Sequence, residues 1–548
     1  MARRPEQDGP VSESTQDPST TDAGKEFQIP LTRFWTLCAG VCLGLFLAMI
    51  DTSIVATSLY NIGSEFNDVG NVNWVALSYT LAYMGFAVVF ARISDIVGRR
   101  DAFVVASVLF VAFSLACGWA QKMHQLIAFR TVQGIGGSGL YSLAMIMLPE
   151  MSPNHLKQYI GAMVGVVIVM AGVLGPILGG LLTNYTTWRW VFWINGPVGA
   201  LSLATFLSSW PVREQRPRLQ KHSWKQLDLV GSFLTIAATV LVVFAFQDAG
   251  VTSGGSSSWQ GNNWQSAVFV APLVAGTLCW VALVAWESMV ERRLASRCSP
   301  VFPMRLFQHS TYTSGVVNTL LLGFPYLLLI YVVPLRIQVV GGKSALLAGV
   351  MLLPMLVTVA LGSIVSGAVN SRKQLIMETL VAGSCLMLLG CGVLTTLSVE
   401  GLDAAKLMGF LTFCGLGFGL AISSSTMIAS LEIAPKDYAS AQGIVAQMRM
   451  FGGSLGIAAS TAILRAGMDG IPSRMSKRQT QTMAEQQNAR LRYAEAFRTD
   501  MIVATAMSGV AAVASAIALW QSRKRTPRQT GERRGPRFLS RCFSFFLD

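Results

Sequence analysis

Three charged residues lie where the rest of the sequence is apolar, and their side chains are the best placed to do chemistry. Asp51, Arg130 and Arg449 each interrupt a long run of mostly apolar residues. A charge buried in such a run is costly and commonly marks the path of a proton, an ion or a polar substrate. A desolvated aspartate can exchange a proton, whereas arginine keeps its proton and instead tunes a carboxylate or binds a substrate. We therefore predict a proton or cation site at Asp51 and a coupling or substrate role for Arg130 and Arg449.

Each of these charges also has a plainer interpretation, which the sequence leaves open. The Asp51 carboxylate would then be a hydrogen-bonded structural group. Arg130, in the first turns of its helix, would extend its side chain to the cytoplasmic membrane interface, as long basic side chains do near helix ends. Arg449, near the middle of its helix, would hydrogen-bond two helices together.

Short patterns typical of enzymes lack the surroundings that their chemistry needs. Residues 134–139 fit the glycine pattern of dinucleotide-binding loops, but no strand–helix–strand unit surrounds them. Residues 452–456 fit the pattern of a nucleophile elbow, but they lie within an apolar helical run. The nine cysteines include no CxxC pair. We predict a protein that is not an enzyme, with no catalytic residues, no cofactor and no metal site.

The elements that must position the three charges are membrane-spanning helices. Of the 548 residues, 52% are hydrophobic and 13% charged, and the mean hydropathy is +0.50. A spanning helix needs about 20 mostly apolar residues. Fourteen such runs lie near residues 34–56, 75–93, 102–120, 126–148, 159–182, 190–210, 228–247, 266–286, 312–334, 346–369, 376–397, 406–430, 440–464 and 500–520. These runs predict an all-α polytopic membrane protein.

The placement of basic residues predicts that both termini face the cytoplasm. Lys and Arg number four before the first run, three in the turn at residues 92–100 and eight after residue 521. Cytoplasmic loops of membrane proteins are enriched in these residues. The long loop 465–498 is also basic and opposes the rule, which long loops obey less strictly. The net charge of +14 follows from this topology and from attraction to anionic lipid, so we expect no nucleic-acid partner.

Small-residue patterns recur with an offset of eight helices, which predicts two halves. Residues 172–179 and 453–460 share small residues at matching positions, and so do 134–136 and 415–417. Two six-helix halves with two inserted helices give this offset. The predicted organisation is a disordered cytoplasmic tail, the N-terminal half, a basic linker with the inserted helices, the C-terminal half and a basic cytoplasmic tail, over residues 1–33, 34–210, 211–310, 311–521 and 522–548.

Several motifs in order along the chain carry a family resemblance. They are residues 50–55 (IDTSIV), 91–100 (ARISDIVGRR, with Ala91 in place of a leading glycine), 172–180 (GVLGPILGG), 188–190 (WRW) and 195–197 (NGP). Over roughly residues 35–520 the chain resembles the fourteen-helix drug:proton antiporters of the major facilitator superfamily, most closely the fungal members. The resemblance implies the major facilitator fold.

The resemblance also implies roles for two motifs. Gly172, Gly175, Pro176, Gly179 and Gly180 match the antiporter motif of the fifth helix, whose bend is associated with export and with blocking leak. The three- and four-residue spacing of the first glycines puts them on one helical face, where a neighbouring helix can approach closely. Tight packing alone remains an alternative.

The turn after the second helix matches the loop signature of the superfamily. Asp95, Gly98, Arg99 and Arg100 would form a cytoplasmic latch that pairs in one conformation and separates in another. A solvated basic turn is the alternative. Asn184 begins a glycosylation sequon in a predicted outer loop.

These observations predict a secondary active transporter. We expect export of small, largely apolar organic compounds, such as drugs, toxins or secondary metabolites, by proton antiport with alternating access. Uptake or facilitated diffusion of a sugar or an iron chelate is the alternative, and a non-transporting membrane receptor is a more distant one. We expect a monomer in the plasma membrane, with a vacuolar or vesicle membrane as the other possibility.

Overall fold

The chain is described by a computed structural model over residues 30–66, 68, 72–153, 157–210, 228–248, 267–294, 300, 302–373, 375–399, 401–433, 437–467 and 483–525. Most of the two predicted tails (residues 1–29 of 1–33 and 526–548 of 522–548) and residues 211–227 of the predicted linker lie outside the described residues. The predicted N-terminal tail of residues 1–33 is too long, because α1 begins at Leu31.

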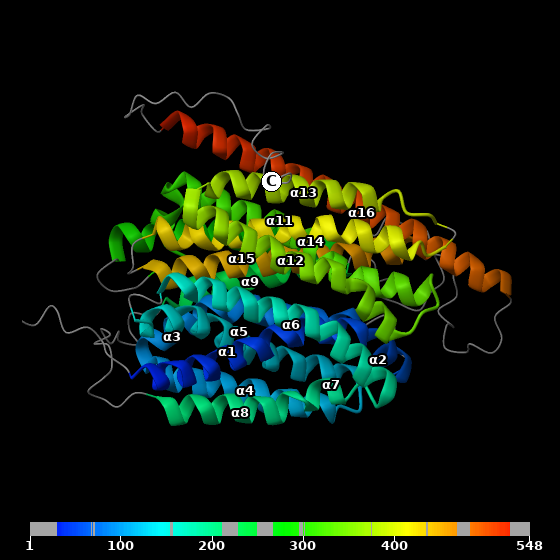
Figure 1. Ribbon diagram of the computed structural model, residues 1–548, viewed down its shortest axis with the longest axis horizontal. Helices are drawn as coiled ribbons and strands as arrows, with labels where there is room; N and C mark the ends of the chain where they lie inside the picture. Colours follow the sequence, from blue (N-terminus) through cyan, green and yellow to red (C-terminus); the bar gives the residue numbers. More distant parts are fainter. Residues whose placement is uncertain are drawn as a thin grey trace, which may run out of the picture.

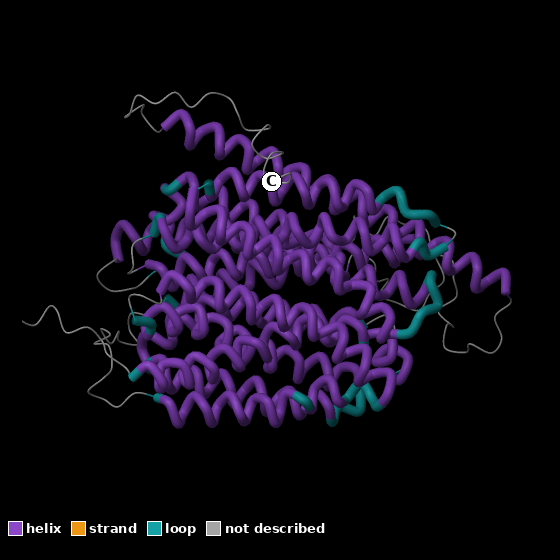
Figure 2. Tube along the Cα trace, viewed as in Figure 1, coloured by secondary structure: helices purple, strands orange, loops and turns teal. Residues whose placement is uncertain are grey.

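The described residues form helices that lie side by side, with no strand among them (Figures 1 and 2). The longer helices are α1 (Leu31–Ile54), α3 (Asn73–Val97), α4 (Arg99–Gly118), α5 (Met123–Met151), α6 (Lys157–Tyr185), α8 (Asn195–Ser209), α9 (Leu229–Asp248), α10 (Ala267–Met289), α11 (Ser310–Val339), α12 (Ala345–Lys373), α13 (Ile376–Leu394), α14 (Ala404–Leu431), α15 (Tyr438–Gly467) and α16 (Met483–Arg525). The short ones are η1 (Val55–Thr57), α2 (Leu59–Glu65), α7 (Trp190–Trp193), η5 (Val290–Leu294) and η6 (Met304–Gln308).

Within the described part of the chain, 12 helices are long and apolar enough to cross a membrane, with α7 and α8 forming one of them. Helices α5 and α15, of 29 and 30 residues, are outside this set. Both carry an arginine and many small or polar residues, and both face neighbouring helices more than lipid. The apolar helical fold is confirmed, and the count of fourteen stays a prediction.

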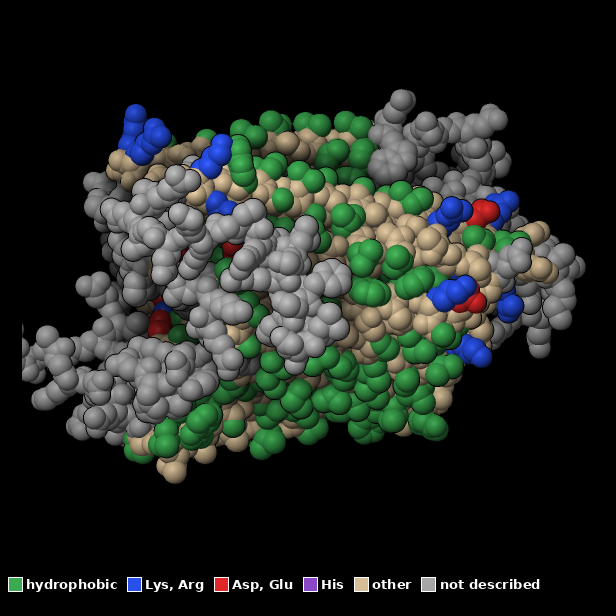
Figure 3. Space-filling model, turned by 45° about the horizontal axis from the view of Figure 1, so that its top comes forward, with side chains coloured by type: hydrophobic (Ala, Val, Ile, Leu, Met, Phe, Trp, Pro, Cys, Tyr) green, Lys and Arg blue, Asp and Glu red, His purple; other side chains and the backbone are tan. Residues whose placement is uncertain are grey.

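The outside of the bundle is apolar over its middle. Phe233, Val281 and Ile364 are 69%, 62% and 60% exposed. On the face in Figure 3, hydrophobic side chains cover the middle and the visible Lys and Arg side chains lie toward the two ends. Exposed apolar patches of this extent are unfavourable in water. Lipid chains would cover them at no such cost.

The helices form two groups with matching packing (Figure 1). In the first group α3 and α4 pack on α5, and α1 packs on α6 and α8. In the second, α12 and α13 pack on α14, and α11 packs on α15 and α16. The groups meet where α3 contacts α15 and α6 contacts α12, while α9 and α10 pack on each other. This is the arrangement of two six-helix halves with two inserted helices.

Three element boundaries differ from the sequence prediction. The short helix α2 was not expected, and the sixth run is divided into α7 and α8. The last helix begins at Met483 instead of near residue 500, so part of the predicted loop 465–498 is helical. Its first turns are polar, and hydropathy therefore does not reveal them.

Candidate functional site

The three charges named from the sequence lie on helices α1, α5 and α15, and two of them form an ion pair. The Asp51 carboxylate and the Arg130 guanidinium are both 0% exposed and are hydrogen-bonded through Oδ2 and Nη1. The other carboxylate oxygen of Asp51, Oδ1, accepts hydrogen bonds from Gln133 Nε2 at 3.0 Å and from Asn195 Nδ2 at 3.2 Å. Asp51 on α1 is thus bound to α5 and to α8.

The Arg130 side chain is held from several sides. Its Nε donates to the Val75 carbonyl at 3.1 Å, and Nη1 donates also to Gln133 Oε1 at 3.0 Å. The guanidinium lies 4.3 Å from the centre of the Tyr79 ring. Its Nη2 is buried and has no hydrogen-bond partner among the described residues. Removing one partner of a buried ion pair is strongly destabilising, because the remaining charge is left without a counter-charge.

The interfacial interpretation of Arg130 is wrong. The side chain is fully buried. It also lies at the wrong end of α5 for a cytoplasmic position. Arg130 is near the start of α5, whereas the end of α5 reaches the predicted cytoplasmic turn at Gly98, where Arg99 pairs with Glu150. We call that end of the bundle the Gly98 end and the opposite one the far end. Arg130 can be buried because the Asp51 carboxylate supplies a counter-charge inside the bundle.

Sequence reasoning missed the amides that complete this site. Gln133 lies three residues after Arg130, so both point from one face of α5. Asn195 was noticed only as part of a motif, yet its amide bridges Asp51 and Ser114 Oγ, the latter at 2.9 Å. For both Gln133 and Asn195, a polar side chain inside an apolar helix was the signal that the sequence offered.

Arg449 lies at the junction of the two halves. From α15 its Nη2 donates to the Tyr141 hydroxyl on α5 at 2.7 Å, and the residue is 9% exposed. A run of rings then leads back to Arg130: the centroids of Tyr141 and Tyr83 are 5.8 Å apart, and those of Tyr83 and Tyr79 are 6.0 Å apart. The structure therefore brings Arg449 near the Asp51 cluster through aromatic side chains, without a direct contact.

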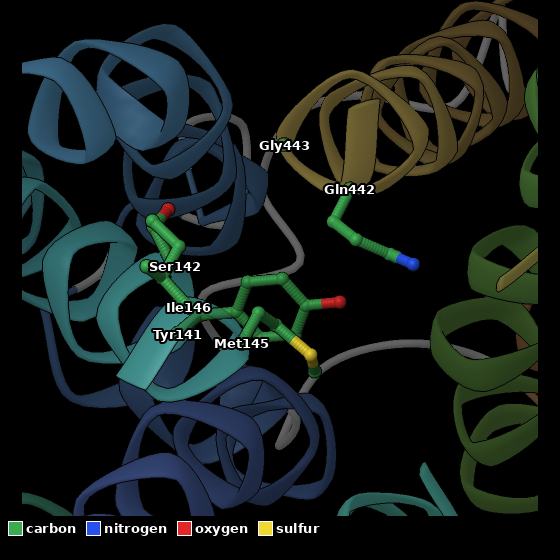
Figure 4. A pocket seen from close by; sticks show the side chains of 6 residues that line it. All are labelled: Tyr141, Ser142, Met145, Ile146, Gln442 and Gly443. Carbon is green, nitrogen blue, oxygen red and sulfur yellow. The ribbon is translucent and has the colours of Figure 1, made fainter. Parts of the chain in front are cut away.

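A small pocket opens between α5 and α15 on the Gly98 side of Arg449 (Figure 4). Its empty volume is about 190 Å³, including open solvent, and it is lined by Tyr141, Ser142, Met145, Ile146, Gln442 and Gly443. The Tyr141 ring and the Gln442 side chain extend from opposite helices into this space. Tyr141 thus lines the pocket and also holds Arg449.

The glycines of α6 make the close approaches that their spacing predicted, with one exception. A Cβ on Gly175 would lie 1.9 Å from Ser53 Oγ, and one on Gly179 would lie 2.3 Å from the Ile54 carbonyl oxygen, both less than one helical turn after Asp51. A Cβ on Gly180 would lie 2.7 Å from the Leu346 Cα of α12. Gly172 is different, because the nearest atom to its Cβ would be 3.7 Å away. Pro176 lies between these contacts inside α6.

The turn at Gly98 is paired in this conformation. Arg99 Nη1 lies 2.6 Å from Asp95 Oδ1, and Arg99 Nη2 lies 2.9 Å from Glu150 Oε1 at the end of α5. Gly98 has a φ of 106°, which favours glycine. Arg100 is exposed and has no ion-pair partner among the described residues. The proposed latch therefore consists of Asp95, Arg99 and a residue that the sequence did not suggest, Glu150.

We expect Glu150→Gln to slow transport several-fold with a small loss of stability, about 1 kcal/mol, because Glu150 is 30% exposed. The free energy of unfolding and the transport rate would be measured together. Glu432→Gln is the matched control: Glu432 follows α14, the counterpart of α5, is exposed, and has no ion pair in the described part of the chain. Equal rates for both variants would remove Glu150 from the latch.

A second buried carboxylate, Asp500 on α16, was also missed. It is fully buried, and its Oδ2 accepts a hydrogen bond from Ser460 Oγ at 2.8 Å. No described residue donates a hydrogen bond to its other oxygen. The sequence analysis placed residue 500 at the edge of the last span, where a carboxylate needs no explanation. The early start of α16 puts it inside the bundle instead.

Two further predictions, glycosylation at Asn184 and the absence of a metal site, stay predictions. Asn184 is exposed in the last turn of α6 at the far end. Among the described residues no group of three or more His, Cys, Asp or Glu side chains has the arrangement of a metal site.

The bundle of apolar helices is that of a membrane protein, and residues 41–457 match the sequence model of the Major Facilitator Superfamily, a family of membrane transporters. The chain belongs to this family. It is 35% identical to the MFS-type transporter FPY5 of Fusarium mangiferae over 443 residues, covering 79% of this chain and 72% of that protein. It is 30% identical to the MFS efflux transporter aclA of Aspergillus oryzae, covering 81% and 78%.

Solved structures share the fold at low identity. A bacterial homologue of the human lysosomal transporter Spinster, in an inward-facing unoccupied conformation, superposes with a TM-score of 0.61 at 16% identity, covering 91% of this chain and 100% of that one. An auto-inhibited peptide transporter of the POT family gives a TM-score of 0.61 at 11% identity, covering 91% and 99%.

Proposed function

We propose that this transporter exports small, largely apolar organic compounds in exchange for protons. The observation that carries the proposal is the Asp51–Arg130 ion pair, buried at the far end of the N-terminal half beside the close contact of α1 with α6. Related fungal proteins are named efflux transporters, which supports the direction. Drugs, toxins or secondary metabolites are the expected substrates.

Proton uptake would act on the contacts of α1. When the Asp51 carboxylate takes a proton, Arg130 loses its counter-charge inside a low-dielectric bundle, and such a change is worth about 3–5 kcal/mol. The pair joins α1 to α5, and Asn195 joins the same carboxylate to α8. Protonation therefore favours a different placement of α1, and release of the proton favours the arrangement described here.

Contacts between the halves at the far end are those that a rocking motion must open. Asn73 Nδ2 of α3 donates to Thr461 Oγ1 of α15 at 3.0 Å, and the Tyr331 hydroxyl of α11 donates to the Thr52 carbonyl of α1 at 2.7 Å. Thr52 is the neighbour of Asp51, so movement of α1 reaches this contact directly. The pocket beside Tyr141 lies on the other side, toward the Gly98 end.

The experiment that tests the proposal is substrate-screened flux in proteoliposomes with and without an imposed pH gradient. Proton antiport predicts uphill substrate movement only with the gradient. Flux that ignores the gradient would favour a facilitative carrier, and binding without flux would favour a receptor. We further propose a monomer in the plasma membrane, with both termini in the cytoplasm.

The direction of transport gives a prediction in cells. Cells that lack this protein should retain more of a labelled substrate, because the inward proton gradient drives export. Restoring the intact chain should reverse the retention, and an uncoupler should mimic the deletion. Intracellular label is the measurement. A fall in label on deletion would reverse the assignment and favour uptake.

A further inference from the structure

Arg449 differs from two other buried arginines, Arg130 and Arg99, in having no acidic partner among the described residues. Arg130 pairs with Asp51 at the far end, and Arg99 pairs with Glu150 at the Gly98 end. No Asp or Glu oxygen of the described residues lies within 4.0 Å of the Arg449 side-chain nitrogens. A cation buried without a counter-charge is costly, and a bound anion would remove that cost.

Aromatic side chains from three other helices lie near this cation. Tyr141 of α5 accepts its hydrogen bond, and the Tyr83 ring of α3 has its centroid 5.8 Å from that of Tyr141. Tyr326 lies one turn after Gly323 of α11, where a Cβ would lie 2.3 Å from the Arg449 carbonyl oxygen. Tyr326 stacks on Phe418 of α14 with a centroid distance of 3.7 Å and an interplanar angle of 5°. Rings contributed by both halves thus offer flat faces around one positive charge.

An unpaired hydrogen-bond donor lies beside Tyr141, the residue that accepts the hydrogen bond from Arg449. Tyr83 is 1% exposed, and its hydroxyl has no hydrogen-bond partner among the described residues. A buried hydroxyl without a partner costs about 1–3 kcal/mol. An anionic oxygen bound to Arg449 would accept a hydrogen bond from the Tyr83 hydroxyl. One ligand group would then supply both the anion that Arg449 lacks and the acceptor that Tyr83 lacks.

The pocket adjoins this group through Tyr141. Gln442 lines the pocket seven residues before Arg449, on the same face of α15, and Tyr141 belongs to both the pocket and the Arg449 contact. A ligand that enters between α5 and α15 therefore meets Tyr141 (Figure 4), whose hydroxyl accepts the hydrogen bond from Arg449.

We propose that the substrates include aromatic organic anions, with the anionic group on Arg449 and Tyr83 and the ring among Tyr141, Tyr326 and Phe418. This inference rests on the proposed function as a transporter and narrows its substrate class. It also gives a path by which substrate binding could affect the Asp51–Arg130 pair. The rings of Tyr141, Tyr83 and Tyr79 lie in contact between Arg449 and Arg130, and the Arg130 guanidinium lies over the Tyr79 ring.

The test compares coumarin-3-carboxylate with coumarin-3-carboxamide, which share a ring system and differ in charge. Binding to the purified full-length protein in nanodiscs would be measured by calorimetry at pH 7. A charge-assisted hydrogen bond predicts about 10–100-fold tighter binding of the carboxylate. Arg449→Gln should abolish this preference, and Arg449→Lys should keep part of it.

Two further variants separate a ligand role from a structural one. Tyr83→Phe removes a hydroxyl that makes no hydrogen bond with the described residues, so it should weaken carboxylate binding without lowering thermal stability. Arg523→Gln removes an arginine charge that is 57% exposed, and it should leave the preference unchanged. Equal affinity of the wild type for both coumarins, absence of carboxylate binding, or an unchanged preference in Arg449→Gln would overturn the proposal.

Failure of the proposal is distinguishable from failure of proton antiport. Carboxylate-selective binding without gradient-driven flux would leave the anion site standing and refute antiport. Gradient-driven flux of the carboxamide alone would refute the anion site and support antiport. Arg449 would then be a strut between the halves.

Discussion

Replacement of Asp51 by asparagine should abolish gradient-driven export while the protein still inserts in the membrane. An asparagine side chain keeps the size of aspartate but has no charge and cannot exchange a proton near neutral pH. Its amide would also leave Arg130 buried without a counter-ion, a change of about 3–5 kcal/mol or roughly 10²–10⁴-fold in an equilibrium. Insertion should survive because Arg130 retains its bonds to Val75 and Gln133. The measurement is substrate flux against its gradient in proteoliposomes.

A paired variant separates loss of coupling from loss of stability. In Asp51→Asn/Arg130→Gln the site is neutral, so the cost of the unpaired cation disappears and thermal stability should partly recover. Gradient-driven transport should remain absent, because no group in the pair can exchange a proton. Uphill transport by Asp51→Asn at the wild-type rate would remove Asp51 from the mechanism.

Transport should also be lost when Gly175 is replaced by leucine. Gly175 faces Ser53, where even a Cβ would lie 1.9 Å from the hydroxyl oxygen, so a leucine must push α6 away from α1. Overpacking of this kind costs about 1–3 kcal/mol, which leaves enough folded protein to detect. The displaced contact adjoins Asp51, so the pair with Arg130 would be disturbed as well.

The same helix provides the control. Gly175→Ala should reduce the transport rate, whereas Gly172→Ala should not, because the nearest atom to a Cβ at Gly172 is Leu356 Cδ2 at 3.7 Å. Both changes raise helix propensity equally, so a difference between them reports the contact with α1. Normal kinetics in Gly175→Leu would show that this contact has no role in transport.

The helices of this fold could be predicted from the sequence, but the pairing of their polar residues could not. Hydropathy located Asp51 and Arg130 inside apolar runs, yet they are separated by 79 residues. No local rule states that they meet. Gln133 was accessible through its spacing from Arg130, whereas Asn195 lies 144 residues from Asp51.

Contacts of the glycines show a similar limit. Spacing put Gly172, Gly175 and Gly179 on one face of a helix, but it could not say where the neighbouring helix comes close. The structure divides them, because α1 contacts Gly175 and Gly179 and leaves Gly172 open. Asp500 was missed for a different reason: the polar first turns of α16 hid the true start of the helix.

The length of α16 has a practical consequence for imaging. A helix of 43 residues is about 65 Å long, roughly twice the hydrocarbon thickness of a bilayer. Part of it must therefore stand in water beyond the membrane, and Figure 1 shows it extending past its neighbours. A binder raised against the exposed turns at Gln487, Asn488 and Arg490 would give single-particle images of this small membrane protein a rigid alignment marker. Because the marker continues into the span that holds Asp500, its tilt would also report movements of the C-terminal half.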